Sequence, residues 1–236
     1  MYYPPYAKFE ADACQLLKQL LHTSNGPMLI PGSATYGEEA AVVSTIEPGD
    51  QVIVVNSGSF GQVLVELVRL SGGKPIEIEV AEGSAVSPDV IRQRLRSTAA
   101  VKMVAIVHVE TSTGAVHPVA EIGHMLSSEF PEVLYLVDCV SSAGGMEVRL
   151  DDWGIDLCIT SPQKCINAPQ GIAIVTASPK AWEVVETLDT PLRAMCLDLH
   201  TWRRYVTAND QPPSGNSFED RNFSDGSYNQ SHPRDW

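Results

Sequence analysis

The chain has 236 residues, 44% of them hydrophobic, which is enough for a substantial buried core in one domain. Its formal net charge of -13 argues against a nucleic-acid or anionic-membrane partner, because such surfaces normally require a basic patch. The apolar runs are too short to span a membrane, and the N-terminus resembles neither a secretory signal nor a transit peptide. We therefore expect a cytoplasmic protein without a membrane partner.

The predicted elements alternate between helix and strand. In chain order they are helix 8–23, helix 36–46, strand 51–56, helix 60–73, strand 74–80, helix 87–97, strand 101–109, helix 117–130, and strands 133–138, 156–160 and 171–177. Several strands are almost continuously apolar, as strands covered on both faces are. This pattern predicts an α/β domain with a mainly parallel sheet.

Composition changes near residue 207. Residues 207–236 are polar and rich in Pro, Gly, Ser, Asn and Asp. Such a segment buries too little apolar surface to offset its ordering entropy, so we expect a folded unit over 1–206 and a disordered tail over 207–236.

The five cysteines are an odd number without paired spacing, which is typical of free thiols in a reducing compartment. No CxxC motif occurs, and the six histidines have no companion ligands at metal spacing. We therefore expect no metal site.

Polar residues follow several of the predicted strands, within segments 32–37, 56–62, 108–114 and 137–145. Ligands of open α/β sheets bind beyond the carboxyl ends of the strands. Lys164 follows another strand, and a lysine at such an edge is able to remain a neutral amine or to form an imine with a carbonyl group.

Several of these residues have two interpretations. Asp138 ends a buried strand and could hold a protonated pyridine nitrogen, or could simply cap the following turn. The loop 32–37 could seat a phosphate at a helix start, or be an ordinary cap. Phe60 could stack on a planar cofactor or fill the core. His108 is more typical of a satisfied strand-end histidine than of an acid–base catalyst.

Other charged residues have simple interpretations. We expect His117 and His124 to be surface residues of a helix. The carboxylates of Glu38, Glu39, Asp151 and Asp152 are expected to be solvated charges at helix starts.

The stretch from residue 137 to 175 is "VDCVSSAGGMEVRLDDWGIDLCITSPQKCINAPQGIAIV". It resembles the lysine region of the class V aminotransferases, which are pyridoxal 5'-phosphate (PLP) enzymes of fold type I. "GSATYGEEAA", "IEPGDQVIVVNSGSFGQ" and "HVETSTGAVHP" resemble earlier motifs of the branch containing alanine–glyoxylate, serine–pyruvate and pyridoxamine–pyruvate aminotransferases, in the same order. The resemblance runs from about residue 9 to 206 and implies the three-layer α/β/α large domain of these enzymes.

By this resemblance Lys164 is the Schiff-base lysine and Asp138 the partner of the pyridinium nitrogen, so the resemblance favours this interpretation of Asp138. Both are implied catalytic residues. The remaining implied contacts to the cofactor are Gln163, Ser33, Ala34 and Thr35 toward the phosphate, Phe60 and Val140 on the two ring faces, and Thr111 near the ring oxygen or phosphate.

The implied reaction is transfer of an amino group between an amino acid and a 2-oxo acid, with Lys164 as both nucleophile and proton carrier, in a homodimer. Family members are much longer than this chain. They have an N-terminal segment lining the site and a small C-terminal domain with the arginine that binds the substrate carboxylate, and we expect both to be missing here. The tail from residue 207 does not match the family. A misread exon boundary or a frameshift would produce unrelated sequence of this kind.

No replacement for that arginine stands out among Arg149, Arg193, Arg203 and Arg204. Two alternatives therefore stay open. The chain could be a catalytically silent, dimerising fragment that binds cofactor, or a PLP lyase or desulfurase on the same fold. Desulfurases typically have His before the lysine, where this chain has Gln163.

Overall fold

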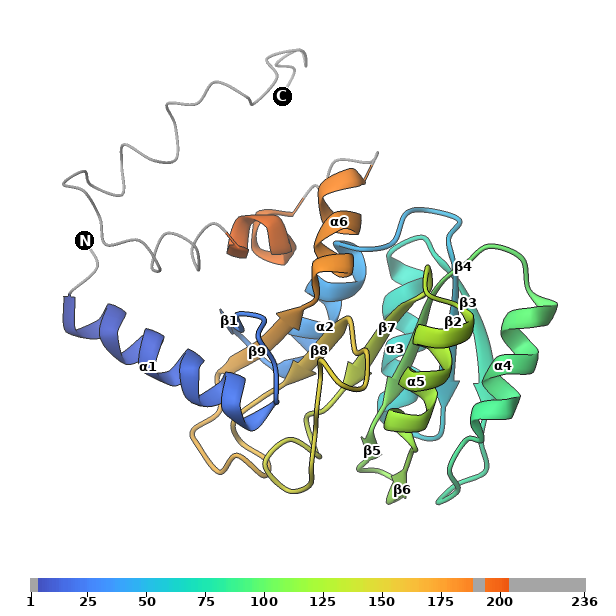
Figure 1. Cartoon of the computed structure of the whole chain (residues 1–236), viewed down its shortest axis with the longest axis horizontal. Coiled ribbons are helices and arrows are strands. Elements are labelled where there is room, and N and C mark those ends of the chain that lie inside the picture. The colour runs from blue at the N-terminus through green and yellow to red at the C-terminus, as the bar shows by residue number, and fades with distance from the viewer. Residues whose placement is uncertain (1–3, 189–193, 204–236) are drawn as a thin grey trace, which may run out of the picture.

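The computed structural model describes residues 4–188 and 194–203, and its centre is a seven-stranded sheet (Figure 1). The strand order is β1-β9-β8-β7-β4-β2-β3. These strands are β1 (Met28–Pro31), β2 (Gln51–Asn56), β3 (Lys74–Glu79), β4 (Val101–Val107), β7 (Leu134–Asp138), β8 (Leu157–Thr160) and β9 (Ile172–Ala177). Only β9 is antiparallel to its neighbours, so the other six strands direct their carboxyl ends to one edge.

Helices cover both faces of the sheet and make three layers. One face packs against α2 (Ala34–Val43), α3 (Ser59–Leu70) and α6 (Pro179–Thr187), and the other against α4 (Pro88–Ser97) and α5 (Val119–Glu129). Helix α1 (Pro4–Leu20) lies beside the β1 end of the sheet, and a short 3-10 helix, η1 (Met195–Leu197), contacts α2. The predicted three-layer α/β/α architecture with a mainly parallel sheet is confirmed.

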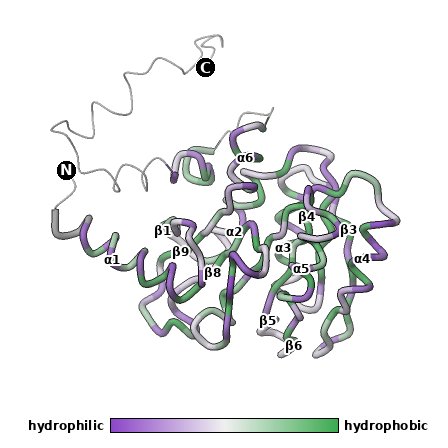
Figure 2. The backbone as a smooth tube through the Cα atoms, viewed as in Figure 1, coloured by the Kyte–Doolittle hydropathy of each residue, from purple (hydrophilic) through white to green (hydrophobic). Residues whose placement is uncertain are grey.

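Two hydrophobic clusters fill the spaces between these layers. In β2, Val52 and Val54 belong to the cluster under α2 and α3, whereas Ile53 and Val55 belong to the cluster under α4 and α5. This alternation follows from the two-residue repeat of a strand, and it explains why the buried strands are apolar at every position. Figure 2 shows the hydrophobic residues along the central strands and hydrophilic ones on α4.

Local sequence signals set several helix starts. Ser33 caps α2 by accepting a hydrogen bond from the amide of Tyr36, and Ser87 caps α4 with Pro88 following it. The predicted helices and strands are confirmed with small shifts of their ends. Strands β1 and the pair β5 (Val109–Glu110) and β6 (Ala115–Val116) were not predicted, nor was α6.

The prediction of one strand over 101–109 is wrong in detail. Strand β4 ends at Val107, and the chain turns at His108 into a separate two-stranded hairpin, in which Val109 pairs with Val116. Within the described part of the chain, no helix is long and apolar enough to cross a membrane. The predicted tail at 207–236 lies outside the described residues, and the boundary at 206 stays a prediction.

Candidate cofactor-binding site

The nine residues expected to hold the cofactor all follow parallel strands at the same edge of the sheet. Ser33, Ala34 and Thr35 follow β1, and Phe60 follows β2. Thr111 lies in the hairpin that comes after β4. Asp138 is the last residue of β7, Val140 lies just beyond it, and Gln163 and Lys164 follow β8. The topology therefore brings them to the edge at which ligands of open α/β sheets bind.

Contacts between loops hold the lysine turn against the loop that follows Asp138. Strands β7 and β8 are parallel neighbours, with Asp138 in register with Ile159. The thiol of Cys165 donates to the backbone oxygen of Ser141 at 3.5 Å, and the hydroxyls of Ser141 and Thr111 are 2.5 Å apart. Thus Lys164, which precedes Cys165 and is exposed, lies in a turn that contacts the loop between 139 and 145.

Asp138 is a buried carboxylate that forms no ion pair in the part of the chain that the structure describes. Its side chain is 3% exposed, and Oδ1 accepts the amide of Val140 at 2.7 Å, so it caps the turn as one interpretation predicted. Burial raises the pKa of Asp138 to about 7, although the Val140 amide opposes this shift. Among the described residues no ion pair involves Asp138. A protonated pyridine nitrogen would supply the missing charge, so the residue fits a pyridinium partner.

The loop at the start of α2 fits a phosphate. Ser33 and Thr35 are exposed there, while Ala34 is buried against the core. The first backbone N–H groups of a helix lack acceptors within the helix, and the positive end of the helix dipole favours an anion. The loop therefore offers N–H groups and hydroxyls at the same edge as Lys164.

Phe60 lies at the start of α3 with its side chain 37% exposed, which argues against the interpretation that it fills the core. Its amide and that of Gly61 donate to one carboxylate oxygen of buried Glu110, at 3.1 and 3.0 Å. The other oxygen of Glu110 accepts from the amide and the hydroxyl of Ser112. Glu110 thus caps α3 and fixes the backbone of Phe60. The sequence interpretation missed this role, because the partners lie 50 residues apart.

Two predictions about polar side chains are wrong, and a third, for His108, is confirmed only in part. Glu38 is buried, not solvated, because the face of α2 that carries it packs on β8 and β9. His117 is buried ahead of α5, where Nδ1 accepts the amide of Val86 at 3.0 Å and Nε2 lies 2.8 Å from the hydroxyl of Ser57. His108 does follow β4, but its buried Nδ1 has no hydrogen-bond partner in the described part of the chain.

The remaining predictions about charged residues have mixed outcomes. His124 is exposed on α5, as expected. Asp151 and Asp152 are also exposed, but they lie in a turn ahead of β8 and not at a helix start. Glu39 is half-buried on α2, so it is not a fully solvated charge. No group of three His, Cys, Asp or Glu side chains in the described ranges could hold a metal ion.

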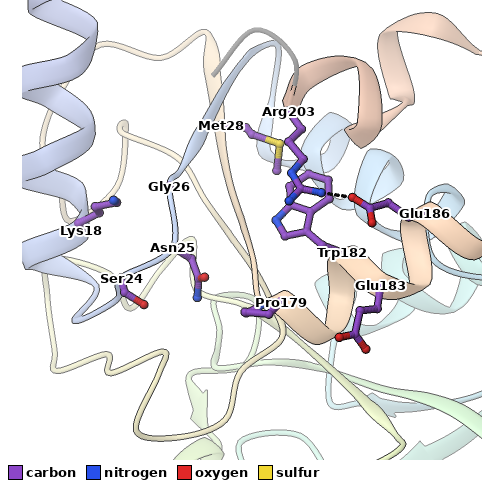
Figure 3. Close-up of a pocket in the computed structure, with 10 residues that line it drawn as sticks. All are labelled: Lys18, Ser24, Asn25, Gly26, Met28, Pro179, Trp182, Glu183, Glu186 and Arg203. Carbon is purple, nitrogen blue, oxygen red and sulfur yellow. Dashed lines mark hydrogen bonds and ion pairs between the residues drawn. The ribbon is translucent and has the colours of Figure 1, made fainter. Parts of the chain in front are cut away.

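The two described candidates for a carboxylate-binding arginine have other contacts. Arg149 pairs with Asp152 and Glu147 in the segment leading into β8. Arg203 pairs with Glu186 and lies over the ring of Trp182 at 4.6 Å from its centroid (Figure 3). Arg193 and Arg204 lie outside the described residues.

The cavity drawn in Figure 3 lies at the opposite edge of the sheet from the predicted site. Its volume is about 460 Å³, and its lining comes from α1, the segment leading into β1, α6 and Arg203. Met28 starts β1 and Pro179 follows the antiparallel strand β9, so both mark the amino ends of the parallel strands. This cavity contains none of the predicted cofactor contacts.

The converging strand ends, the buried carboxylate and the lysine turn define a large domain of the PLP-dependent, fold type I class. The family described as Aminotransferase class-V matches residues 14–200. The chain belongs to the class-V aminotransferase family, whose enzymes use PLP.

Individual relatives agree with this assignment. An uncharacterized aminotransferase of Methanocaldococcus jannaschii is 36% identical over 208 residues, covering 88% of this chain and 53% of the relative. The (S)-ureidoglycine–glyoxylate transaminase of Bacillus subtilis is 34% identical, covering 77% and 43%. The crystal structure of alanine–glyoxylate aminotransferase from Nostoc sp. superposes with a TM-score of 0.82 at 30% identity, covering 86% and 53%. The chain thus spans about half the length of these relatives.

Proposed function

We propose that this chain binds PLP through Lys164 and acts as an aminotransferase between an amino acid and a 2-oxo acid. The observation that carries the proposal is the buried carboxylate of Asp138, which has no cationic partner among the described residues and ends the strand next to the one that leads to Lys164. The matches to named aminotransferases support the same reaction class.

When bound, PLP supplies an aromatic ring that accepts the electron pair left by deprotonation of a substrate Cα. The amine of Lys164 would hold PLP through its aldehyde carbon, with loss of water, and as a free amine it would take up the Cα proton of the substrate and return it. Asp138 keeps the ring nitrogen protonated by holding a negative charge beside it. The loop at Ser33–Thr35 and Gln163 hold the phosphate, Thr111 binds the ring oxygen or phosphate, and Phe60 and Val140 enclose the ring.

A spectroscopic experiment tests cofactor attachment. PLP added to the purified protein should produce a visible band that borohydride removes, and peptide mapping should place the reduced cofactor on Lys164. Lys164→Ala should abolish both results. The control is Lys180→Ala, which should retain them, because the amine of Lys180 is bound to the backbone oxygen of Val133 and to the carboxylate of Asp156. A borohydride-stable complex formed by the Lys164→Ala variant would overturn the assignment.

Activity requires a separate measurement, because the chain spans about half of its relatives. Single-turnover mixing with an amino acid should convert bound PLP to its amine form and release a 2-oxo acid. Cofactor attachment without this conversion would favour the alternative of a catalytically silent, cofactor-binding fragment. Sulfide release from cysteine would instead indicate a desulfurase.

We also propose that the protein forms a homodimer. Phe9 and Leu16 of α1 are exposed apolar side chains, 73% and 66% accessible, of the kind that an interface covers. Sedimentation equilibrium measures the assembly directly. A monomer at all concentrations, with and without PLP, would contradict the proposal.

A further inference from the structure

Glu38 is a buried carboxyl group beside the predicted cofactor contact Asp138. It lies on α2 with 3% of its surface exposed. The preceding residue, Gly37, has no side chain, and a Cβ there would lie 2.8 Å from the Cβ of Ala173 and 3.4 Å from Cγ2 of Ile159. Because Ile159 is in register with Asp138, this close packing places the start of α2 beside the strand end that carries Asp138.

The two carboxyl groups interact directly. The side chains of Glu38 and Asp138 share a hydrogen bond, and such a bond between two carboxyl groups requires one proton. One oxygen of Glu38, Oε2, is buried and accepts no hydrogen bond from an N–H or hydroxyl group of the described residues. A neutral carboxyl group tolerates this environment far better than a carboxylate does.

The charges around the pair decide which group holds the proton. Burial raises the pKa of Glu38 well above its usual range, and the negative charge of Asp138 raises it further. Burial also raises the pKa of Asp138, but hydrogen bonds from the Val140 amide and from Glu38 lower it. Cys139 and Glu110 also face Asp138, and both raise its pKa. Asp138 also accepts the amide of Val140 at 2.7 Å, whereas Oε2 of Glu38 has no donor among the described residues, so we assign the proton to Glu38.

We propose that Glu38 is a positioning residue whose neutral carboxyl group donates a hydrogen bond to Asp138 and holds that carboxylate ionised and directed at the cofactor's ring nitrogen. This inference rests on the proposed function, because it assigns the ring nitrogen to Asp138. Glu38 itself contacts no reacting atom in this proposal and acts only through Asp138. A fixed donor beside Asp138 spares the site from reorienting that carboxylate when the cofactor binds.

Two substitutions separate the donor role from a purely structural one. Glu38→Gln keeps a donor group of the same length, whereas Glu38→Met keeps the length and removes the donor. Urea denaturation of both variants shows whether each is folded before its titration is compared with that of the original protein.

The first readout needs no cofactor. In the full chain labelled with 13C at aspartate carboxyl groups, and assigned with Asp138→Asn, we expect the titration midpoint of Asp138 to rise in Glu38→Met and to stay close to the original in Glu38→Gln. Loss of the donor destabilises the ionised form, which sets the direction of this shift. An unchanged midpoint in Glu38→Met, or a rise in Glu38→Gln equal to that in Glu38→Met, would overturn the proposal.

The second readout is the PLP dissociation constant as a function of pH. Near neutral pH we expect about ten-fold weaker binding in Glu38→Met, the size expected for loss of a hydrogen bond to a charged group, and little change in Glu38→Gln. The pH below which affinity falls should also be higher in Glu38→Met. Equal affinity of Glu38→Met and the original protein across this range would overturn the positioning role.

The two readouts distinguish failure of the inference from failure of the proposed function. If the original protein forms no complex with PLP, the proposed function fails, and the apo titration alone decides whether Glu38 supports an ionised Asp138. If PLP binds through Lys164 but the titration midpoint of Asp138 is the same in Glu38→Met as in the original protein, the inference fails while the proposed function stands.

Discussion

The carboxylate of Glu110 accepts the backbone amide of Phe60 at 3.1 Å, and the two residues are 50 positions apart in the chain. The bond joins the start of α3, which follows β2, to the hairpin that follows β4. Because Glu110 is fully buried, this connection is protected from water. The predicted ring-stacking residue is therefore held by the backbone, while its side chain remains partly exposed at the sheet edge.

Replacement of Glu110 should consequently destabilise the whole domain. Glu110→Ala leaves the amides of Phe60 and Gly61 without their acceptor, and we expect a loss of about 2–3 kcal/mol in the free energy of unfolding, as for a helix cap with a charged acceptor. Urea denaturation followed by circular dichroism measures this loss of unfolding free energy. Glu66→Ala is the control, because this glutamate lies on the same helix in an exposed ion pair with Arg69 and should cost at most about 0.5 kcal/mol. Equal losses in the two variants would contradict the capping role.

The same junction restricts Gly58. A Cβ at this position would lie 2.4 Å from Oγ of Ser112 and 2.7 Å from Cγ of Glu110, so Gly58→Ala forces the two loops apart. We expect a loss of roughly 1–3 kcal/mol in unfolding free energy and weaker PLP binding, because Phe60 moves with its loop. Ser59→Ala alters the exposed neighbour and should change stability little. If Gly58→Ala were as stable as Ser59→Ala, the prediction would be wrong, because the two loops would then move apart without a loss of unfolding free energy.

The raised pKa of Asp138 predicts how the stability of the cofactor-free protein depends on pH. Burial raises the pKa of Asp138 to about 7 from its usual 3.8, so the folded state binds this proton more tightly than the unfolded state does. The contribution of the protonated Asp138 side chain to the free energy of unfolding is fully present below about pH 4 and is lost as pH rises through 7. The difference between these two limits is on the order of 4 kcal/mol. Glu38, whose pKa burial also raises, acts in the same direction.

Asp138→Asn tests this contribution, because the amide keeps the shape of the side chain but does not titrate. Urea unfolding at pH 5 and at pH 8 should show a smaller pH-dependent loss in Asp138→Asn than in the original protein. Asp12→Asn, which replaces an exposed aspartate on α1, is the control for replacing one aspartate elsewhere in the domain. Equal slopes of stability against pH in Asp138→Asn and the original protein would mean that the carboxyl group titrates normally.

The sequence predicted those features of the site that depend on local patterns. Apolar runs located the strands, and the residues following them, such as Asp138 and Lys164, were placed correctly at one edge because parallel strands share that edge. Strand β1 escaped prediction because it has four residues and ends at a proline, Pro31, which weakens any strand signal.

The errors concern burial that is decided by distant segments. Glu38 lies early in a helix, where a charged residue is usually solvated, but α2 packs on the distant strands β8 and β9 and Glu38 is buried. His117 was expected on a surface, but Ser57, 60 positions away, contacts its ring. Single-sequence periodicity contains no information about contacts of this range, so the roles of Glu38 and Glu110 required the tertiary structure.

Asp151 secures the connection between α1 and β1. Its carboxylate accepts the hydroxyl of Thr23 at 2.6 Å, and the amide and hydroxyl of Ser24 at 2.8 and 2.9 Å. Burial alone would raise the pKa of Asp151, but these hydrogen bonds outweigh it and lower that pKa. The stabilisation is therefore present at neutral pH and is lost as pH falls through the lowered folded pKa.

We expect Asp151→Ala to lose about 1–2 kcal/mol of unfolding free energy at pH 7 because several hydrogen bonds disappear together. The matched control is Asp152→Ala, which removes the adjacent aspartate and its exposed ion pair with Arg149, and should cost at most about 0.5 kcal/mol. Urea unfolding at pH 7 and pH 3 measures both variants, and the gap between Asp151→Ala and the original protein should narrow at pH 3. A gap that is the same at both pH values would show that the ionised carboxylate of Asp151 is not what holds the connection.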